Sequence, residues 1–143
     1  MIYPATQEIS NYFTMQDIKH RIDETDTASF VEAGFNGKVV KGLIVRYFSS
    51  SERNDVAVRV ANFGGGSVPD DRKDEILVLL NTLNCQFRFA KFCLTPAGTI
   101  SVEFDLPQNT AFDALGETAR EIFIRLIQIC DSAYPQVMKV LWG

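Results

Sequence analysis

The stretch "SFVEAGFNGKVVKGLIVRYF", residues 29–48, contains two apolar runs that are separated by Asn36 and Gly37. An Asn-Gly pair between apolar runs is a strong signal for a β-hairpin, because both turn residues tolerate positive φ. In the next run, "VAVRVANF" at residues 56–63, valines alternate with alanine or arginine, which predicts a third antiparallel strand. Consecutive strands of this kind favour an α+β fold over the alternating βα units of an α/β fold.

Helices are predicted on both sides of these strands. A first helix begins near Pro4 and ends near Met15 or extends to about Ile22, and a loop follows at residues 23–27. A second helix follows the glycines at residues 64–66, and its apolar side chains surround much of its surface. We therefore expect the second helix to be largely buried.

Two further strands, "FRFAKFCL" (87–94) and "TISVEFDL" (99–106), flank a Pro-Gly turn. The first of them loses its alternation near Ala90, which indicates a bulge or a strand buried on both faces. A long helix is predicted to end near Ser132, and Pro135 opens a short terminal helix.

The element order is therefore α-βββ-α-ββ-α. It predicts an α+β fold with an antiparallel sheet, in one domain that spans residues 1–143.

The segment "NFGGGSVPDD", residues 62–71, places three glycines between a strand and a helix, as phosphate-binding loops do. It lacks the lysine and hydroxyl residue of a P-loop, and Pro69 stands where a Rossmann loop has its third glycine. Four carboxylates at the helix start would repel an anion. The pattern favours a connector in which Ser67 and Asp70 cap the helix. A small-ligand or nucleotide sensor that uses the Gly64–Ser67 loop is the alternative.

Composition excludes several classes of function. A net charge of −4 without a basic cluster argues against nucleic acid as the partner. No apolar run is long enough to span a bilayer, and no signal peptide is recognised, so we expect a cytoplasmic protein. The three cysteines lack CxxC spacing, and the single histidine, His20, is predicted at the surface between two cations. The sequence predicts no catalytic, cofactor or metal site, and no enzyme.

The segments "EILVLLNTLNCQFRFAKFCLTPAGTISVEFDLP" (75–107) and "AREIFIRLIQICDSAYPQVMKVLWG" (119–143) resemble the YbjN-like family of proposed bacterial sensory-transduction regulators. The resemblance rests on Asn81 and Asn84 late in a helix, on a phenylalanine-rich hairpin, and on a long helix that runs into Tyr-Pro and a terminal tryptophan. It implies a fold like that of type III secretion chaperones and a non-enzymatic, protein-binding module. The two asparagines are expected to cap and hydrogen-bond within the helix.

A partner surface is predicted from the strand at residues 39–48, which is apolar on both faces. One face can pack against helices, and the other needs a partner or a further helix to cover it. The candidate partner residues are Leu43, Val45, Tyr47, Phe87 and Phe89. The resemblance adds the expectation of a homodimer that binds a protein partner and no cofactor.

Overall fold

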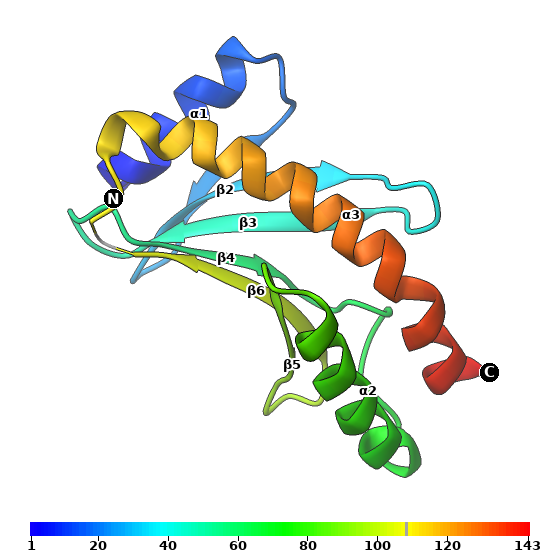
Figure 1. Ribbon diagram of the computed structural model, residues 1–143. Coiled ribbons are helices and arrows are strands. Elements are labelled where there is room, and N and C mark those ends of the chain that lie inside the picture. Colours follow the sequence, from blue (N-terminus) through cyan, green and yellow to red (C-terminus); the bar gives the residue numbers. More distant parts are fainter. Residues whose placement is uncertain (108) are drawn as a thin grey trace.

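The computed structural model describes residues 1–107 and 109–143, in which three α-helices accompany a six-stranded antiparallel sheet (Figure 1). The strand order across the sheet is β1-β2-β3-β4-β6-β5. The elements are α1 (Pro4–Met15), β1 (Arg21–Glu24), β2 (Ser29–Phe35), β3 (Leu43–Ser49), β4 (Val56–Val60), the 3-10 helix η1 (Asp70–Arg72), α2 (Lys73–Gln86), β5 (Lys91–Leu94), β6 (Ile100–Leu106), the 3-10 helix η2 (Phe112–Ala114) and α3 (Leu115–Trp142).

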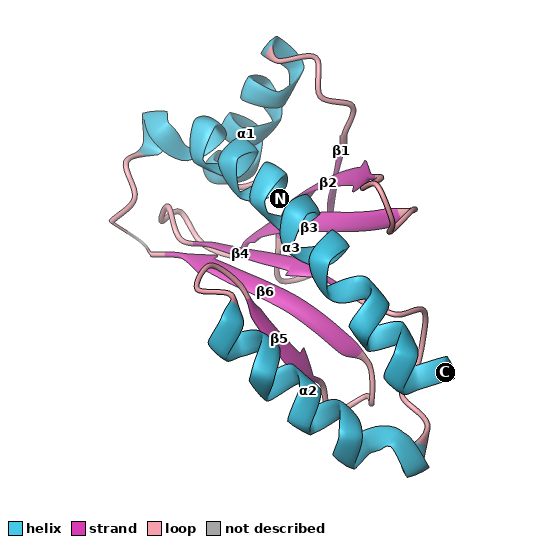
Figure 2. Ribbon diagram, turned by 45° about the vertical axis from the view of Figure 1, so that its right-hand side comes forward, coloured by secondary structure: helices cyan, strands magenta, loops and turns pink. Residues whose placement is uncertain are grey.

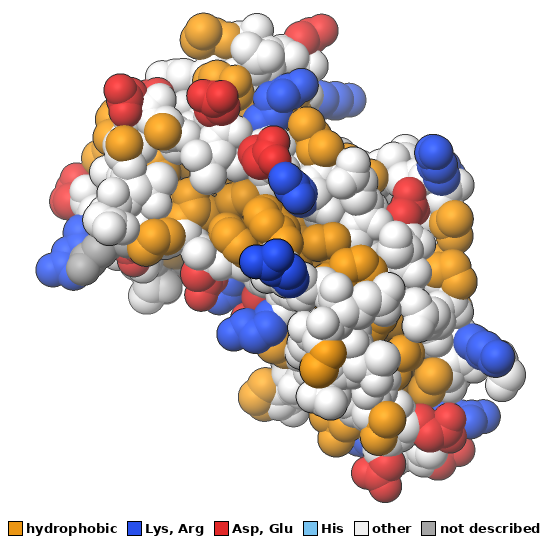
Figure 3. Space-filling model, in the orientation of Figure 1, with side chains coloured by type: hydrophobic (Ala, Val, Ile, Leu, Met, Phe, Trp, Pro, Cys, Tyr) orange, Lys and Arg blue, Asp and Glu red, His pale blue; other side chains and the backbone are white. Residues whose placement is uncertain are grey.

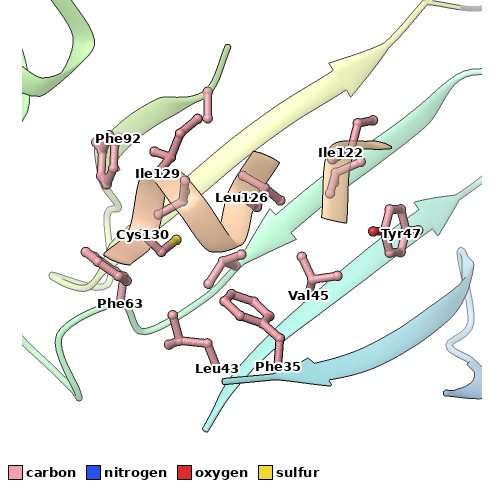
Figure 4. Close-up of a cluster of buried hydrophobic side chains, with 14 of the residues drawn as sticks. Phe35, Leu43, Val45, Tyr47, Phe63, Phe92, Ile122, Leu126, Ile129 and Cys130 are labelled. Atoms are coloured by element: carbon pink, nitrogen blue, oxygen red, sulfur yellow. The ribbon is translucent and has the colours of Figure 1, made fainter. Parts of the chain in front are cut away.

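The predicted α+β class with an antiparallel sheet is therefore confirmed. Helices α1 and α3 lie on one face of the sheet, and α2 lies beside β5 (Figures 1 and 2). The core forms where α3 crosses the inner side chains of the central strands (Figure 4). Within the described residues no helix crosses the opposite face of the sheet, which we call the outer face.

Strand β1 was not predicted, because its residues were assigned to the first helix or to a loop. Helix α1 ends after Met15, and Asp17 adopts a positive φ of 56°, as residues beyond a helix end often do. The chain then pairs with β2 as an edge strand whose four residues are all exposed. An exposed, mostly charged strand has no apolar alternation, so the period-2 signal is missing.

The first hairpin is present, but its turn differs from the predicted two-residue type. Strands β2 and β3 are joined by residues 36–42, in which the Asn36 side chain accepts a hydrogen bond from the Gly42 amide at 2.8 Å. Asp131 of α3 accepts three backbone N–H bonds from residues 38–40, at 2.6, 3.0 and 2.9 Å. These bonds, that of the Val40 amide above all, hold the pKa of Asp131 below its ordinary value. The turn is therefore shaped by a distant helix.

Helix α3 is continuous through Pro135, where the sequence predicts a break. A proline inside a helix removes one hydrogen bond and costs about 3 kcal/mol in an isolated helix. Ala133, Val137 and Leu141 are buried on both sides of Pro135 and belong to the same core as the rest of α3. This packing offsets the local penalty, so tertiary contacts override the proline signal.

Two further local predictions need correction. Ser67 forms an isolated bridge with Thr99 and does not cap a helix, because η1 precedes α2 and no side-chain cap is present there. Residues 87–90 follow α2 and lie outside the sheet, which the chain joins at Lys91, so the break in alternation marks the start of β5 and not a bulge within a strand.

Asn84 stabilises the free edge of β5 and does not terminate α2. Its side-chain amide donates to the Phe92 carbonyl at 3.0 Å and accepts from the Phe92 amide at 2.7 Å. Two backbone groups at the sheet edge are thereby satisfied by one side chain.

We expect Asn84→Ala to lower the free energy of unfolding by about 1–3 kcal/mol, because both Phe92 groups lose their partner. Asn81→Ala is the matched control, because Asn81 is exposed on the same helix, and its effect should be within about 0.5 kcal/mol. Urea denaturation of both variants measures this, and equal effects would show that the two bonds do not stabilise the edge.

Candidate functional site

Three of the predicted partner residues are not on the surface. Leu43, Val45 and Tyr47 point toward α3 and are almost fully buried (Figure 4). The Tyr47 hydroxyl donates to the backbone carbonyl of Ala119 at 2.9 Å, and burial raises the pKa of this phenol. The prediction that these β3 residues meet a partner is therefore wrong, because α3 covers this side of β3.

The outer face of the sheet is covered by its own charged side chains. The guanidinium groups of Arg21 and Arg46 each lie 5.8 Å from the centre of the Phe30 ring, which is nearly buried although no helix of the described chain lies over it. Glu32 joins the two arginines, at 2.6 Å to Arg21 and 2.8 Å to Arg46, and the bond from Arg21 is the main cause of its lowered pKa. Phe30 of β2 is therefore shielded without a third helix or a partner, whereas Ile44 of β3, on the same face, has 41% of its surface exposed.

Phe87 and Phe89, the other two predicted partner residues, lie on the segment of residues 87–90 between α2 and β5. Both are half-buried. The Phe89 ring stacks on Phe104 of β6 with their centroids 4.3 Å apart, and the guanidinium group of Arg125 of α3 lies 5.7 Å from the Phe89 centroid. The structure therefore brings Phe89 together with residues that the sequence did not assign to a site.

Three depressions in the surface meet at Phe89, with volumes of about 310, 340 and 300 Å³. The first lies toward β6 and the start of β5, the second toward α3, and the third between β6 and the first turns of α3. Hydrophobic side chains gather between α3 and β6 near the centre of Figure 3, beside Lys and Arg side chains. We call this region the Phe89 surface; it comprises Phe87, Arg88, Phe89, Lys91, Phe104 and Arg125.

The Phe89 surface carries two cations that no carboxylate of the described residues pairs with. Arg88 and Lys91 are exposed and form no ion pair within the described residues. The nearby carboxylates of Glu103 and Asp105 are both held by Arg59 of the outer face, at 3.7 and 2.6 Å. The first depression thus combines partly exposed aromatic area with these two cations, whereas Glu117 and Glu121 line the third. An anionic, partly apolar ligand is therefore favoured at the first depression.

Sequence reasoning missed Arg88, Phe104 and Arg125. Phe104 has the same parity as the core residues of β6, and Arg125 is on the polar side of an amphipathic helix. The one available signal was the loss of alternation near Ala90, which marks where the chain enters the sheet.

The glycine loop has no part in these depressions. Gly64, Gly65 and Gly66 all have positive φ, so the loop requires glycine for its backbone path. The indole N–H of Trp142 donates to the Gly64 carbonyl at 3.5 Å, and a Cβ at Gly64 would lie 2.9 Å from Leu141. The loop therefore packs against the end of α3, and none of the three depressions at Phe89 includes one of its residues.

His20 is a half-buried linking residue and not the predicted surface histidine. One ring nitrogen bonds the Ser10 hydroxyl at 2.8 Å, and the other bonds the Ile18 carbonyl at 2.7 Å. This Ser-His contact has a backbone carbonyl where catalytic triads have a carboxylate, and Ser10 lies within α1 with 9% of its surface exposed. The contact ties the segment before β1 to α1.

Neither a metal-binding cluster nor a membrane-spanning helix is found in the described part of the chain. Its His, Cys, Asp and Glu side chains form no group of three that could hold a metal ion. None of its helices has the length and apolar character needed to cross a membrane.

The comparisons with known proteins show a family and a shared fold. A search of the curated proteins found no match. A solved structure described as "Crystal structure of YbjN, a putative transcription regulator from E. coli" matches with a TM-score of 0.57 and 10% sequence identity, covering 91% of each chain, which shows a shared fold. Residues 7–138 match the YbjN family, which is described as "Putative bacterial sensory transduction regulator". The chain belongs to the YbjN family.

Proposed function

We propose that the chain is a non-enzymatic regulatory module of the bacterial cytoplasm that binds a segment of a partner protein at the Phe89 surface. The observation that carries the proposal is the meeting of three depressions at one half-buried aromatic ring, with unpaired cations beside it. The descriptions of the family and of the similar structure, both of which name a regulator, support a regulatory role.

The chemistry of the surface specifies the kind of segment that fits. Phe87 and Phe89 supply apolar area at the centre, where interfaces gain most of their binding energy. Arg88 and Lys91 lie at the rim, where charges select the partner and speed association. The partner segment is therefore acidic where it meets Arg88 and Lys91, and it carries an aromatic or aliphatic side chain that enters the first depression, of about 310 Å³.

The experiment compares the proteins that are captured from the native host by wild-type protein and by three variants. Phe89→Ser removes the central ring, Arg88→Glu reverses a rim charge on an exposed residue, and Val78→Ser removes an exposed apolar side chain of α2 as the matched control. We expect a protein retained by wild type and Val78→Ser but lost, by about tenfold or more, from Phe89→Ser and Arg88→Glu.

Thermal unfolding of all three variants separates loss of binding from loss of the fold. Arg88 makes no ion pair in the described chain, so Arg88→Glu should leave the unfolding temperature unchanged. If the same proteins are captured whatever the residue at positions 88 and 89, or if only nucleic acid depends on Arg88, the proposed function is wrong.

A further inference from the structure

Strand β1 is an outer edge of the sheet with unpaired backbone groups. The Thr25 amide donates to the Ala28 carbonyl at 2.7 Å, and this bond shows which residues of β1 direct their backbone groups toward β2. Because antiparallel ladders alternate, Arg21 and Asp23 bond to β2, whereas the N–H and C=O groups of Ile22 and Glu24 point away from it. The Glu24 amide accordingly bonds the side chain of Asp23 at 2.8 Å and not the sheet.

The charges on β1 are complementary to those of a second copy of the same strand. In an antiparallel pair related by a two-fold axis perpendicular to the sheet, residues that face each other must lie on the same face. An axis at Arg21 or at Asp23 would bring two like charges together. An axis at Ile22 places Arg21 opposite Asp23 of the second copy, twice, and Ile22 opposite itself.

The residues at this edge suit such a contact. Ile22 has 36% of its surface exposed, and the exposed Met1 is held beside β1 by an ion pair between its amino group and Glu24. Both side chains of the facing pair are half exposed, at 54% for Arg21 and for Asp23. Charged edge strands usually prevent pairing with another chain, because like charges meet. In the register centred on Ile22, opposite charges face each other instead.

We propose that two copies of the chain form a symmetric dimer by antiparallel pairing of their β1 edges about Ile22. One antiparallel sheet then continues through both copies, and Arg21 exchanges its contact with Asp23 of its own strand, at 2.9 Å, for Asp23 of the other copy while it keeps Glu32. The Phe89 surface is near β5, at the opposite edge of the sheet, so the dimer leaves both copies of that surface open. This proposal is independent of the proposed function.

The test uses charge reversal in two variants that should dimerise only with each other. Asp23→Arg alone sets Arg21 against an arginine, and Arg21→Asp alone sets two aspartates together, so each should weaken self-association about tenfold or more. In an equal mixture, both facing pairs again carry opposite charges, and dimers should return. Sedimentation over a concentration series measures this, because a contact along one short edge is expected to dissociate on dilution.

A cross-linking measurement keeps the proposal testable where charge reversal beside Glu32 disturbs the fold. In a Cys85→Ser background, which removes the exposed cysteine, Ile22→Cys places two thiols opposite each other on the axis. It should form a covalent dimer on mild oxidation, and Val78→Cys, the control at a more exposed position, should not. Equal cross-linking of the two variants, or wild-type protein that stays monomeric over the whole series, overturns the proposal.

Discussion

Gly116→Ala should destabilise the protein by about 3 kcal/mol, one of the largest effects expected from a single added methyl group. Gly116 lies in the first turn of α3, where a Cβ atom would overlap the Cβ of Tyr12 in α1. The Tyr12 Cβ is fixed to the backbone and cannot rotate away, so the two helices must separate. The gain in helix propensity of alanine over glycine, about 1 kcal/mol, is too small to compensate.

Urea denaturation measures the effect, with Gly34→Ala as the matched control. Gly34 is exposed on β2, and the nearest atom to an added Cβ is the Leu43 carbonyl oxygen at 3.8 Å, so this substitution should be neutral or slightly stabilising. If Gly116→Ala is as stable as wild type, α1 and α3 do not pack as closely as described.

Leu126→Ala should destabilise the protein by about 2–5 kcal/mol, the usual range for a leucine removed from a packed core. Leu126 is fully buried where α3 crosses the sheet, among the labelled residues of Figure 4. Its loss leaves a cavity between Val45 and the neighbouring residues of α3, since the strands beneath cannot all collapse into it.

The control is Ile124→Ala on the same helix. Ile124 has 38% of its surface exposed and should lose about 1 kcal/mol or less. If the slope of each denaturation curve is unchanged, the substitutions alter the stability of the protein and not the compactness of its folded or unfolded state. A larger loss at position 124 than at 126 would mean that α3 presents a different side to the sheet.

The positions of several elements were predictable because their signals are local. Apolar alternation in β4 and β6, the Pro-Gly turn between β5 and β6, and the apolar stripe of α3 each depend on residues within a few positions of one another. The same local reasoning missed β1, whose exposed residues carry no periodic pattern, and divided α3 at Pro135.

The candidate site was only half predictable for a related reason. Phe87 and Phe89 are conspicuous in the sequence, and both are part of the Phe89 surface. Leu43, Val45 and Tyr47 are equally apolar, yet they are core residues. Alternation divides β3 into two faces, but it does not say which face α3 covers, because the choice depends on the path of a helix that begins about seventy residues later.

The sequence by itself therefore determined the class of fold, since hydrophobic period and turn chemistry are properties of short segments. Only the tertiary structure decided which face of the sheet is buried, how Asp131 shapes the β2–β3 turn, and how Asn84 closes the edge of β5. It also brought Phe89, Phe104 and Arg125 together from three elements. The physical reason is that these contacts join groups whose proximity depends on how whole elements pack. The hydrophobic periodicity of a short segment contains no information about that packing.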